Sequence, residues 1–294
     1  MDLIKLEENY KKYYKLLMIF PIVLLIISIG ILAHSYQMTG DIIDRDVSLK
    51  GGLTVTINTE VPHTQFEKII NDNFKSKEFL VRKLAEFGSD KQIGVIIETS
   101  DIKEPELKDI LQKNLDLKLT KDNYFVEEVG SALGKEFYSQ MIRALIFSFI
   151  LMAIVVVAFY RKLIPSIAVM QAAFSDIVVT MAVLNLIGHK LSPAGIGALL
   201  LLIGYSVDSD MVLTTNTLQR QNESVIAGFI RSFKTGMTMT LTTFAAVIIG
   251  FFLSISSILK EIFLIMLIGL VVDVIYTYLI NAGLMMWYIE RHKK

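Results

Sequence analysis

Residues 191–215 read LSPAGIGALLLLIGYSVDSDMVLTT, an apolar block that nevertheless contains Asp208 and Asp210. A helix of that length extends about 38 Å, which is enough to cross roughly 30 Å of hydrocarbon. Five other blocks of this kind occupy about 16–36, 142–160, 164–187, 236–258 and 262–288. The 294 residues are 53% hydrophobic and 20% charged, with a mean hydropathy of +0.54. These values exclude an ordinary soluble enzyme and predict a membrane α-helical bundle of six transmembrane helices.

The chain contains no cysteine, which excludes disulfide scaffolds, cysteine zinc sites and thiol nucleophiles. Its 29 basic and 29 acidic residues balance overall but not along the chain. Residues 38–140 hold 14 Lys and Arg against 19 Asp and Glu, and the remainder holds 15 against 10. A nucleic-acid-binding protein would carry a basic domain, and this sequence has none. We therefore expect no nucleic-acid partner, and we identify no metal or cofactor motif.

The distribution of basic residues predicts the orientation in the membrane. With six spans and an internal N-terminus, residues 1–15, 161–163, 216–235 and 289–294 lie in the cytoplasm. These segments contain twelve basic residues: Lys5, Lys11, Lys12, Lys15, Arg161, Lys162, Arg220, Arg231, Lys234, Arg291, Lys293 and Lys294. The span ends and short loops of the opposite side contain Arg143, Lys190 and Lys260. This bias predicts a multi-pass protein of the cell membrane with both termini in the cytoplasm.

The first apolar block follows a basic tail, as the core of a signal peptide does. It is too long for that role, and His34-Ser35-Tyr36 is a poor cleavage site. We interpret it as a retained span. The tail either lies along the membrane interface or extends that span as a solvated helix. The predicted division is a cytoplasmic interfacial tail at 1–15, transmembrane helix one at 16–36, an extracytoplasmic domain at 37–140, and transmembrane helices two to six at 141–294.

Residues 37–140 have the pattern of a small α+β domain. Leu53, Val55 and Ile57 alternate with polar residues, which predicts a strand. Thr64-Gln65-Phe66-Glu67 has the spacing of a capping box at the start of a helix. Further strands are predicted at 79–86 and 91–98, joined through Gly88-Ser89-Asp90, then a helix from about Pro105 and a strand at 123–129. The order β-α-β-β-α-β predicts a ferredoxin-like domain, in which His63 is the only histidine.

Four aspartates lie within the predicted spans: Asp176, Asp208, Asp210 and Asp273. A carboxylate at bilayer depth costs a few kcal/mol, so such residues normally face a bundle interior and serve ions or protons. Hydroxyl side chains, including that of Thr242, accompany the aspartates. The alternative is a purely structural role, in which these polar side chains form hydrogen bonds between helices. Lys234 is the cation nearest to a span interior. Desolvation of the aspartates without a neighbouring cation favours their protonated form. The candidate ion-coupling residues are Asp208, Asp210, Asp176, Asp273, Thr242 and Lys234.

An intramembrane aspartyl protease is a weaker interpretation of the same aspartates. Asp208 and Asp210 lie about 200° apart around a helix, so they cannot face each other as a catalytic pair. Asp208 and Asp273 could do so, but the Gly-x-Gly-Asp motif of that class is absent. We therefore predict that the chain is not an enzyme.

Several stretches resemble the SecF family of protein-export subunits. Gly204-Tyr205-Ser206-Val207-Asp208-Ser209-Asp210 resembles the signature of the family's fourth span, and Leu49-Lys50-Gly51-Gly52 its Gly-Gly element after span one. Val129–Glu136 resembles the Val-Gly-x-x-Leu-Gly stretch before span two. Ser175-Asp176 is similar to a His-Asp pair in span three, and Leu241-Thr242-Thr243 to the threonine-rich span five. The resemblance extends over nearly the whole chain and is of the archaeal type.

The sequence departs from the bacterial pattern at two places. Bacterial members have Gly-Tyr-Ser-Val-Asn-Asp, whereas here Asp208 stands at the Asn position and Ser209 at the Asp position. Asp208 also matches the aspartate of the related span of SecD. The arginine that heads span five in bacterial members corresponds to Thr235, with Lys234 beside it. These matches make Asp208 the first candidate for the proton carrier and leave a cationic role for Lys234 in question.

The resemblance implies a subunit of the SecDF complex, similar to the RND superfamily, that with SecD uses the proton gradient to promote protein export. The implied partners are SecD, the Sec translocon channel, the unfolded secreted protein and membrane lipid. Two alternatives remain open at this point. An RND-type small-molecule exporter subunit predicts a defined pocket with converging polar and aromatic groups. A structural scaffold predicts that the aspartates only position helices.

Overall fold

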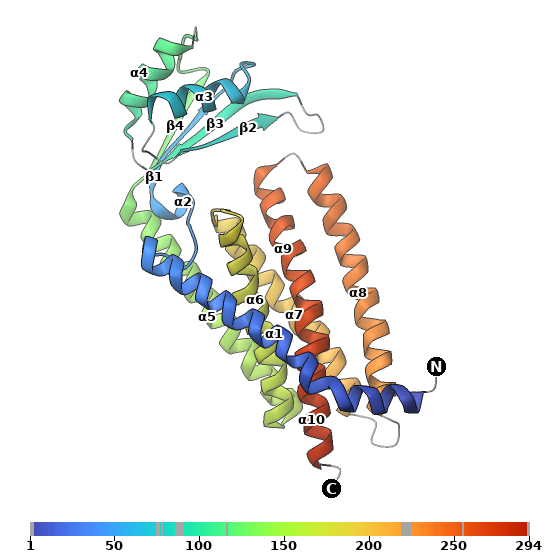
Figure 1. The fold of residues 1–294 in the computed structure, drawn as a ribbon. Helices are drawn as coiled ribbons and strands as arrows, with labels where there is room; N and C mark the ends of the chain where they lie inside the picture. The colour runs from blue at the N-terminus through green and yellow to red at the C-terminus, as the bar shows by residue number, and fades with distance from the viewer. Residues whose placement is uncertain are drawn as a thin grey trace.

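The structure is a computed structural model, and it describes residues 3–74, 77, 79–85, 91–100, 102–115, 117–218, 225–254 and 256–292. Figure 1 shows an α+β domain at one end of a bundle of long helices. Helix α1 (Leu3–Thr39) begins, and α10 (Ala282–His292) ends, at the end of the bundle opposite the domain. The predicted tail is helical from Leu3 onward and continues directly into the first span.

Five described helices are long and apolar enough to cross a membrane, so the chain is a membrane helical protein. They are α1, α5 (Ser131–Tyr160), α6 (Leu163–Leu186), α7 (Pro193–Leu218) and α8 (Val225–Leu253). The sixth predicted span falls on α9 (Ser257–Ile275), the π-helix η1 (Tyr276–Asn281) and α10, which follow one another directly. Helix α9 carries three charged residues, Lys260, Glu261 and Asp273.

Helices α5 and α8 differ clearly in extent from the apolar blocks that predicted them. Helix α5 begins at Ser131, eleven residues before the predicted span, because polar turns continue the helix beyond the apolar block. A Cβ on Gly134 would meet the backbone of Lys50, so glycine allows the short helix α2 (Val47–Lys50) to lie against α5. Helix α8 ends at Leu253 instead of near residue 258.

In its described residues, from Gly52 to Val129, the domain has four strands and two helices in the order β-α-β-β-α-β. They are β1 (Gly52–Ile57), α3 (His63–Asn73), β2 (Phe79–Ala85), β3 (Gln92–Thr99), α4 (Glu104–Asn114) and β4 (Tyr124–Val129). The sheet order is β2-β3-β1-β4, and every neighbouring pair is antiparallel. Alternate residues of β1 face the helices, where Val55 and Ile57 bury against Phe66 and Leu107. The predicted connection through Gly88-Ser89-Asp90 lies outside the described residues.

The predicted capping box is wrong. Helix α3 begins at His63 and follows Pro62, and no side chain of its own first turn caps it. Gln92 of β3 takes that role instead, because its Oε1 accepts the His63 N–H at 3.2 Å and its amide donates to Val61 O at 2.5 Å. One of the N–H groups at the start of the helix is therefore satisfied across the domain.

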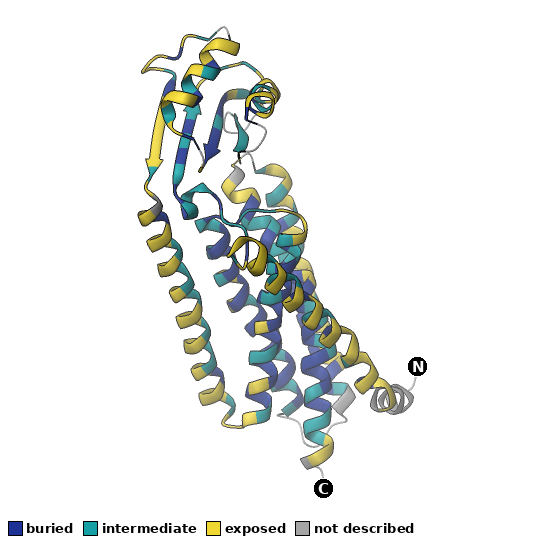
Figure 2. Ribbon diagram, turned by 60° about the vertical axis from the view of Figure 1, so that its left-hand side comes forward, coloured by how far each residue is buried: buried dark blue, intermediate teal, exposed yellow. Residues whose placement is uncertain are grey.

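Burial in the bundle is uneven. Figure 2 shows that buried residues concentrate in the central helices, whereas exposed residues line much of α1 and α5. Helices α6 and α7 contribute thirteen buried residues each, and α9 with η1 packs between them and α8. The Tyr276 hydroxyl donates to Pro21 O at 2.8 Å and ties α1 to this centre. Any polar side chain on the shared faces of α6, α7 and α9 is therefore held away from water and lipid.

Candidate ion-coupling site

Three of the four membrane aspartates meet at the centre of the bundle. Asp176 of α6 and Asp210 of α7 are 0% exposed, and Asp273 of α9 is 1% exposed. Each comes from a different helix, and α6, α7 and α9 pack directly on one another. The prediction that these three aspartates face the bundle interior agrees with this burial.

Hydroxyl groups of α7 contact two of the carboxylates. Ser206 Oγ donates to Asp176 Oδ2 at 2.5 Å. Ser209 Oγ lies 2.9 Å from Asp273 Oδ1 and 3.0 Å from Oδ2. These contacts join α7 to α6 on one side and to α9 on the other, so α7 is the common partner of the site.

The π-helix η1 supplies the contacts of the third carboxylate. Thr277 Oγ1 lies 2.8 Å from Asp210 Oδ1 and 3.2 Å from Asp273 Oδ1. The Asn281 side-chain amide donates to Asp210 Oδ1 at 2.8 Å. The Thr214 hydroxyl in turn donates to Asn281 Oδ1 at 3.3 Å. Short π-helical turns are rare and often occur at functional sites.

Thr277 and Asn281 were not predicted from the sequence, although one signal pointed to them. Asp273, Thr277 and Asn281 follow one another at intervals of four in an apolar segment. That spacing places polar groups on one face of a helix. Because the segment is π-helical, both Thr277 and Asn281 reach Asp210.

Two acceptors of the site have no partner among the residues that the structure describes. Asp176 Oδ1 and Asp210 Oδ2 are buried without a hydrogen-bond partner. Among the described residues, no Lys, Arg or His forms an ion pair with any of the three aspartates. No group of three or more metal-ligating side chains is found there either. Ionised carboxylates buried without a cation cost several kcal/mol each, so this arrangement suits carboxyls that hold and exchange protons.

Apolar clusters close the site toward both ends of the bundle. On the side of the domain, Leu184, Ile196, Leu199 and Ile265 are buried together. Toward the opposite end, α7 and α10 bury a second cluster against Tyr14 and Phe229, which comprises Leu213, Met285 and Met286. The carboxylates are therefore occluded from both sides in this conformation.

The prediction that Asp208 lies among the interior hydroxyls is wrong. Asp208 is exposed on α7, whereas Ser206, Ser209 and Asp210 are buried. Two residues correspond to about 200° of helical rotation, so Asp208 and Asp210 face opposite directions. Asp208 lines a shallow groove of about 410 Å³ between α7 and α8, together with Met211, Val212, Thr215, Asn216 and Met239.

Thr242 and Lys234 also lie outside the buried site. Both are exposed on α8. Thr242 Oγ1 donates to Thr238 O at 3.0 Å and to Met239 O at 2.8 Å, and Thr238 donates to Lys234 O at 2.8 Å. The hydroxyls of Thr242 and Thr238 are thus satisfied within α8 and do not reach the aspartates. The predicted candidates separate into a buried group of three and an outward-facing group of three.

Comparison with known proteins identifies the family. A family model described as "Protein export membrane protein SecD/SecF, C-terminal" matches residues 109–291. The protein-export membrane protein SecF of Methanolacinia petrolearia is 36% identical over 283 residues, which cover 95% of each chain. The SecF of Methanocaldococcus jannaschii is 32% identical over 293 residues, with 96% of this chain and 98% of the relative covered. The chain belongs to the SecF family. The resemblance found in the sequence is therefore confirmed.

Solved structures agree with this fold. SecDF from Thermus thermophilus, a translocon-associated membrane protein, superposes with a TM-score of 0.72 at 18% identity. A second structure, SecDF in a super-membrane-facing form, superposes with a TM-score of 0.61 at 16% identity. Each comparison covers 96% of this chain, which spans 38% of the first SecDF chain and 39% of the second.

Proposed function

We propose that this SecF-family chain is an auxiliary subunit of the Sec protein-export machinery that, with SecD, uses the transmembrane proton gradient to promote export. The observation that supports the proposal most directly is the occluded group of Asp176, Asp210 and Asp273. Buried carboxyls that serve no catalytic constellation are expected to mark ion or proton pathways. The SecF relatives favour protein export over the small-molecule exporter.

The proposed proton step follows from the chemistry of the hydroxyl groups. A hydroxyl can accept one hydrogen bond while it donates another. Thr277 lies between Asp210 and Asp273. When one of these carboxyls is protonated, it donates to the Thr277 hydroxyl, and the hydroxyl donates to the other carboxylate. When Thr277 passes its hydrogen to an ionised Asp210 and takes the proton of Asp273, a carboxylate remains at Asp273, and Ser209 and Thr277 are its donors. The change alters the contact between α7 and α9, as alternating access to two sides of a membrane requires.

We extend the proposal to topology. Six spans are counted when α9, η1 and α10 form the last one, and the domain is then a ferredoxin-like unit on the outer face of the cell membrane. Both termini lie in the cytoplasm, in agreement with the basic residues of the tail and of the α8 start. Helices α1 and α5 contact lipid through exposed apolar residues such as Phe20 and Phe147. The outer domain contacts the unfolded secreted protein or the Sec channel.

We assign the groove between α7 and α8 to SecD. Asp208 lies ten residues before the end of α7, within the span, and faces outward. A carboxylate directed at lipid is costly, so a protein partner is the expected cover for this surface. Lys234 and Thr242 are exposed on the neighbouring helix α8. In the heterodimer, Asp208 is the second candidate for proton transfer after the buried group.

The function is tested with Asp273→Asn in vesicles that contain SecD and the Sec channel. Asparagine keeps the shape of the side chain and an acceptor for Ser209 but cannot release a proton. Export stimulated by an imposed pH gradient should be abolished, and basal export should persist. Asp208→Asn is the matched variant on the outward face. If Asp273→Asn responds fully while Asp208→Asn does not, the buried group is structural and the outward aspartate carries the proton.

A further inference from the structure

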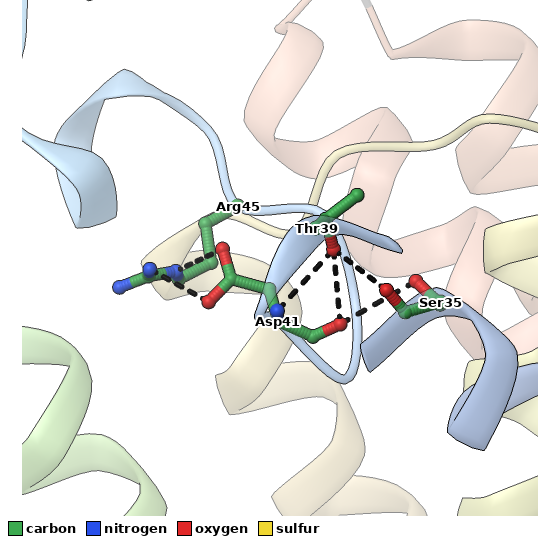
Figure 3. Close-up of polar contacts among 4 residues, drawn as sticks. All are labelled: Ser35, Thr39, Asp41 and Arg45. Carbon is green, nitrogen blue, oxygen red and sulfur yellow. Dashed lines mark hydrogen bonds and ion pairs between the residues drawn. The ribbon is translucent and has the colours of Figure 1, made fainter. Parts of the chain in front are cut away.

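The connector between α1 and the domain is an ordered element. Figure 3 shows Thr39 and Asp41 at the end of α1, where Thr39 Oγ1 donates to Ser35 O at 2.9 Å and accepts the Asp41 N–H at 3.2 Å. Arg45 forms a two-pronged ion pair with Asp41, at 2.7 Å and 3.0 Å. Its guanidinium also lies 4.6 Å from the ring centroid of Tyr138 on α5. Residues 40–50 therefore have a defined shape before the first strand begins.

The connector is bonded to the loop between α6 and α7. Leu191 N–H donates to Asp44 O at 2.7 Å, and Asp46 N–H donates to Leu191 O at 3.1 Å. The Asn185 amide donates to Ile42 O at 3.0 Å. Ile43 and Leu49 of the connector bury in the same apolar cluster as Leu191 and the outer parts of α7 and α9. Displacement of this loop must therefore displace the base of the domain.

Glu261 of α9 fixes the other side of that loop. Its Oε1 accepts the Ser192 N–H at 2.9 Å, and its Oε2 accepts the Ser192 hydroxyl at 2.6 Å. His189 Nε2 lies 3.6 Å from the same carboxylate. Ser192 Oγ in turn accepts the N–H of Gly195 at 3.2 Å in the first turn of α7. Glu261 is 6% exposed, and a Cβ on Gly195 would collide with its carboxylate.

Helices α7 and α9 are thus joined at two levels. Ser209 and Asp273 join them at the buried site, and Ser192 and Glu261 join them near the domain. Glu261 and Asp273 are separated by twelve positions, which correspond to about 18 Å of helix. A cavity of about 340 Å³ lies between β2 and the ends of α8 and α9, and Glu261, His189 and Asp46 line it together with Leu80, Arg82, Phe251 and Leu264. The connector packs on the helices through Ile43 and Leu49.

We propose that Glu261 is a positioning residue that transmits displacement between α7 and α9 through Ser192 and the connector to the outer domain. The inference rests on the proposed function, because it names the route by which the buried carboxyls act on the domain. A helix transmits displacement along its axis with little loss, so a change at Asp273 reaches Glu261. The two charge-assisted bonds to Ser192 make this joint stiffer than apolar packing alone.

The test uses the full chain with SecD in vesicles. The chain has no cysteine, so Lys113→Cys on α4 and Phe252→Cys at the end of α8 provide two unique exposed label sites. The distance between the labels is measured with and without a pH gradient, together with gradient-stimulated export. The variants are Glu261→Ala, Glu261→Gln, and Lys260→Ala as the neighbouring control.

Glu261→Ala should reduce the distance change and the stimulation about tenfold, as expected for the loss of two bonds to a charged group. Glu261→Gln should keep part of both, because its amide oxygen can accept the Ser192 N–H, whereas its amide nitrogen cannot accept from the Ser192 hydroxyl as Oε2 does. Lys260→Ala should match the unsubstituted chain. Ser192→Ala serves as the second variant if Glu261→Ala does not accumulate. It removes one of the two bonds to Glu261, together with the bonds that Ser192 Oγ accepts from the Ala194 and Gly195 N–H groups, and an intermediate loss is expected.

A full response in Glu261→Ala or Ser192→Ala overturns the inference. The two proposals remain separable through Asp273→Asn in the same vesicles. If only the Glu261 and Ser192 variants keep the response, the route is wrong and the proton function stands. If Asp273→Asn keeps it as well, the buried group does not carry the proton, and the proposed function is wrong too only when Asp208→Asn also responds fully.

Discussion

Asp210 and Asp273 share one hydroxyl group, because Thr277 Oγ1 lies 2.8 Å from Oδ1 of Asp210 and 3.2 Å from Oδ1 of Asp273. The hydroxyl has a single hydrogen, so it serves one carboxylate as donor and can serve the other only as acceptor. The two carboxyls are therefore linked through a residue that does not itself ionise.

Thr277→Val tests this link. Valine has nearly the same shape and lacks the hydroxyl, so each carboxyl loses one partner, at a cost of about 1–2 kcal/mol in the free energy of unfolding. Gradient-stimulated export should fall severalfold, and Thr277→Ser should restore it. Thr242→Val on the exposed face of α8 is the matched control and should leave export unchanged. Equal behaviour of the two valine variants in the export assay would refute a shared role of Thr277.

Asp208→Leu tests the assignment of the groove between α7 and α8. If SecD covers this surface, leucine removes a polar contact, and less SecD should be recovered with the chain after solubilisation in mild detergent. If lipid covers it, leucine relieves the cost of an exposed carboxylate and recovery should not change. Leu201→Ala, also exposed on α7, is the control. Recovery of SecD equal to that of the control would count against the assignment.

The orientation is tested with an impermeant thiol reagent. Lys113→Cys on the exposed surface of α4 should react in intact cells, and a reporter fused after residue 294 should be active only in the cytoplasm. The physical reason is the excess of basic residues on the side of the termini. Reaction of Lys113→Cys only after lysis would show that the orientation is inverted.

Asp46 predicts a pH-dependent stability of the connector. Burial raises the pKa of Asp46 to about 6, with further contributions from the carboxylates of Glu98 and Glu261. Because this pKa is raised in the folded state, the stabilising contribution is complete below about pH 4 and is lost as the pH rises through about 6. Above that pH the buried charge costs up to about 3 kcal/mol.

Asp46→Asn should therefore raise the unfolding temperature at pH 7.5 and change it little at pH 4. Asparagine can keep the bond that Asp46 Oδ1 accepts from the Leu49 N–H at 3.3 Å, since both residues cap helices well. Thermal unfolding of the two proteins at several pH values checks the prediction. A difference between them that is the same at both pH values would exclude titration of Asp46 as its cause.

The positions of the apolar helices and the element order of the domain followed from local patterns in the sequence. Long apolar blocks predicted the helices because crossing a bilayer needs a minimum length, and the alternation of Leu53, Val55 and Ile57 predicted β1 because a strand repeats every two residues. The aspartates were also found this way, since a carboxyl is conspicuous in an apolar segment. The motif around Asp208 was sufficient to find the family.

The choice between Asp208 and Asp210 required the tertiary structure. A soluble helix shows its buried face through the contrast between apolar and polar residues, but α7 is apolar on all sides because lipid replaces water. The sequence therefore predicted that the two side chains lie about 200° apart around the helix axis, but it did not indicate which of them faces inward. Packing against α6 and α9 decided for Asp210. In the same way, the contacts of Asn281 with Asp210, of Gln92 with the start of α3, and of Glu261 with Ser192 join residues far apart in the chain. No local pattern encodes such contacts, because each depends on how separate elements pack.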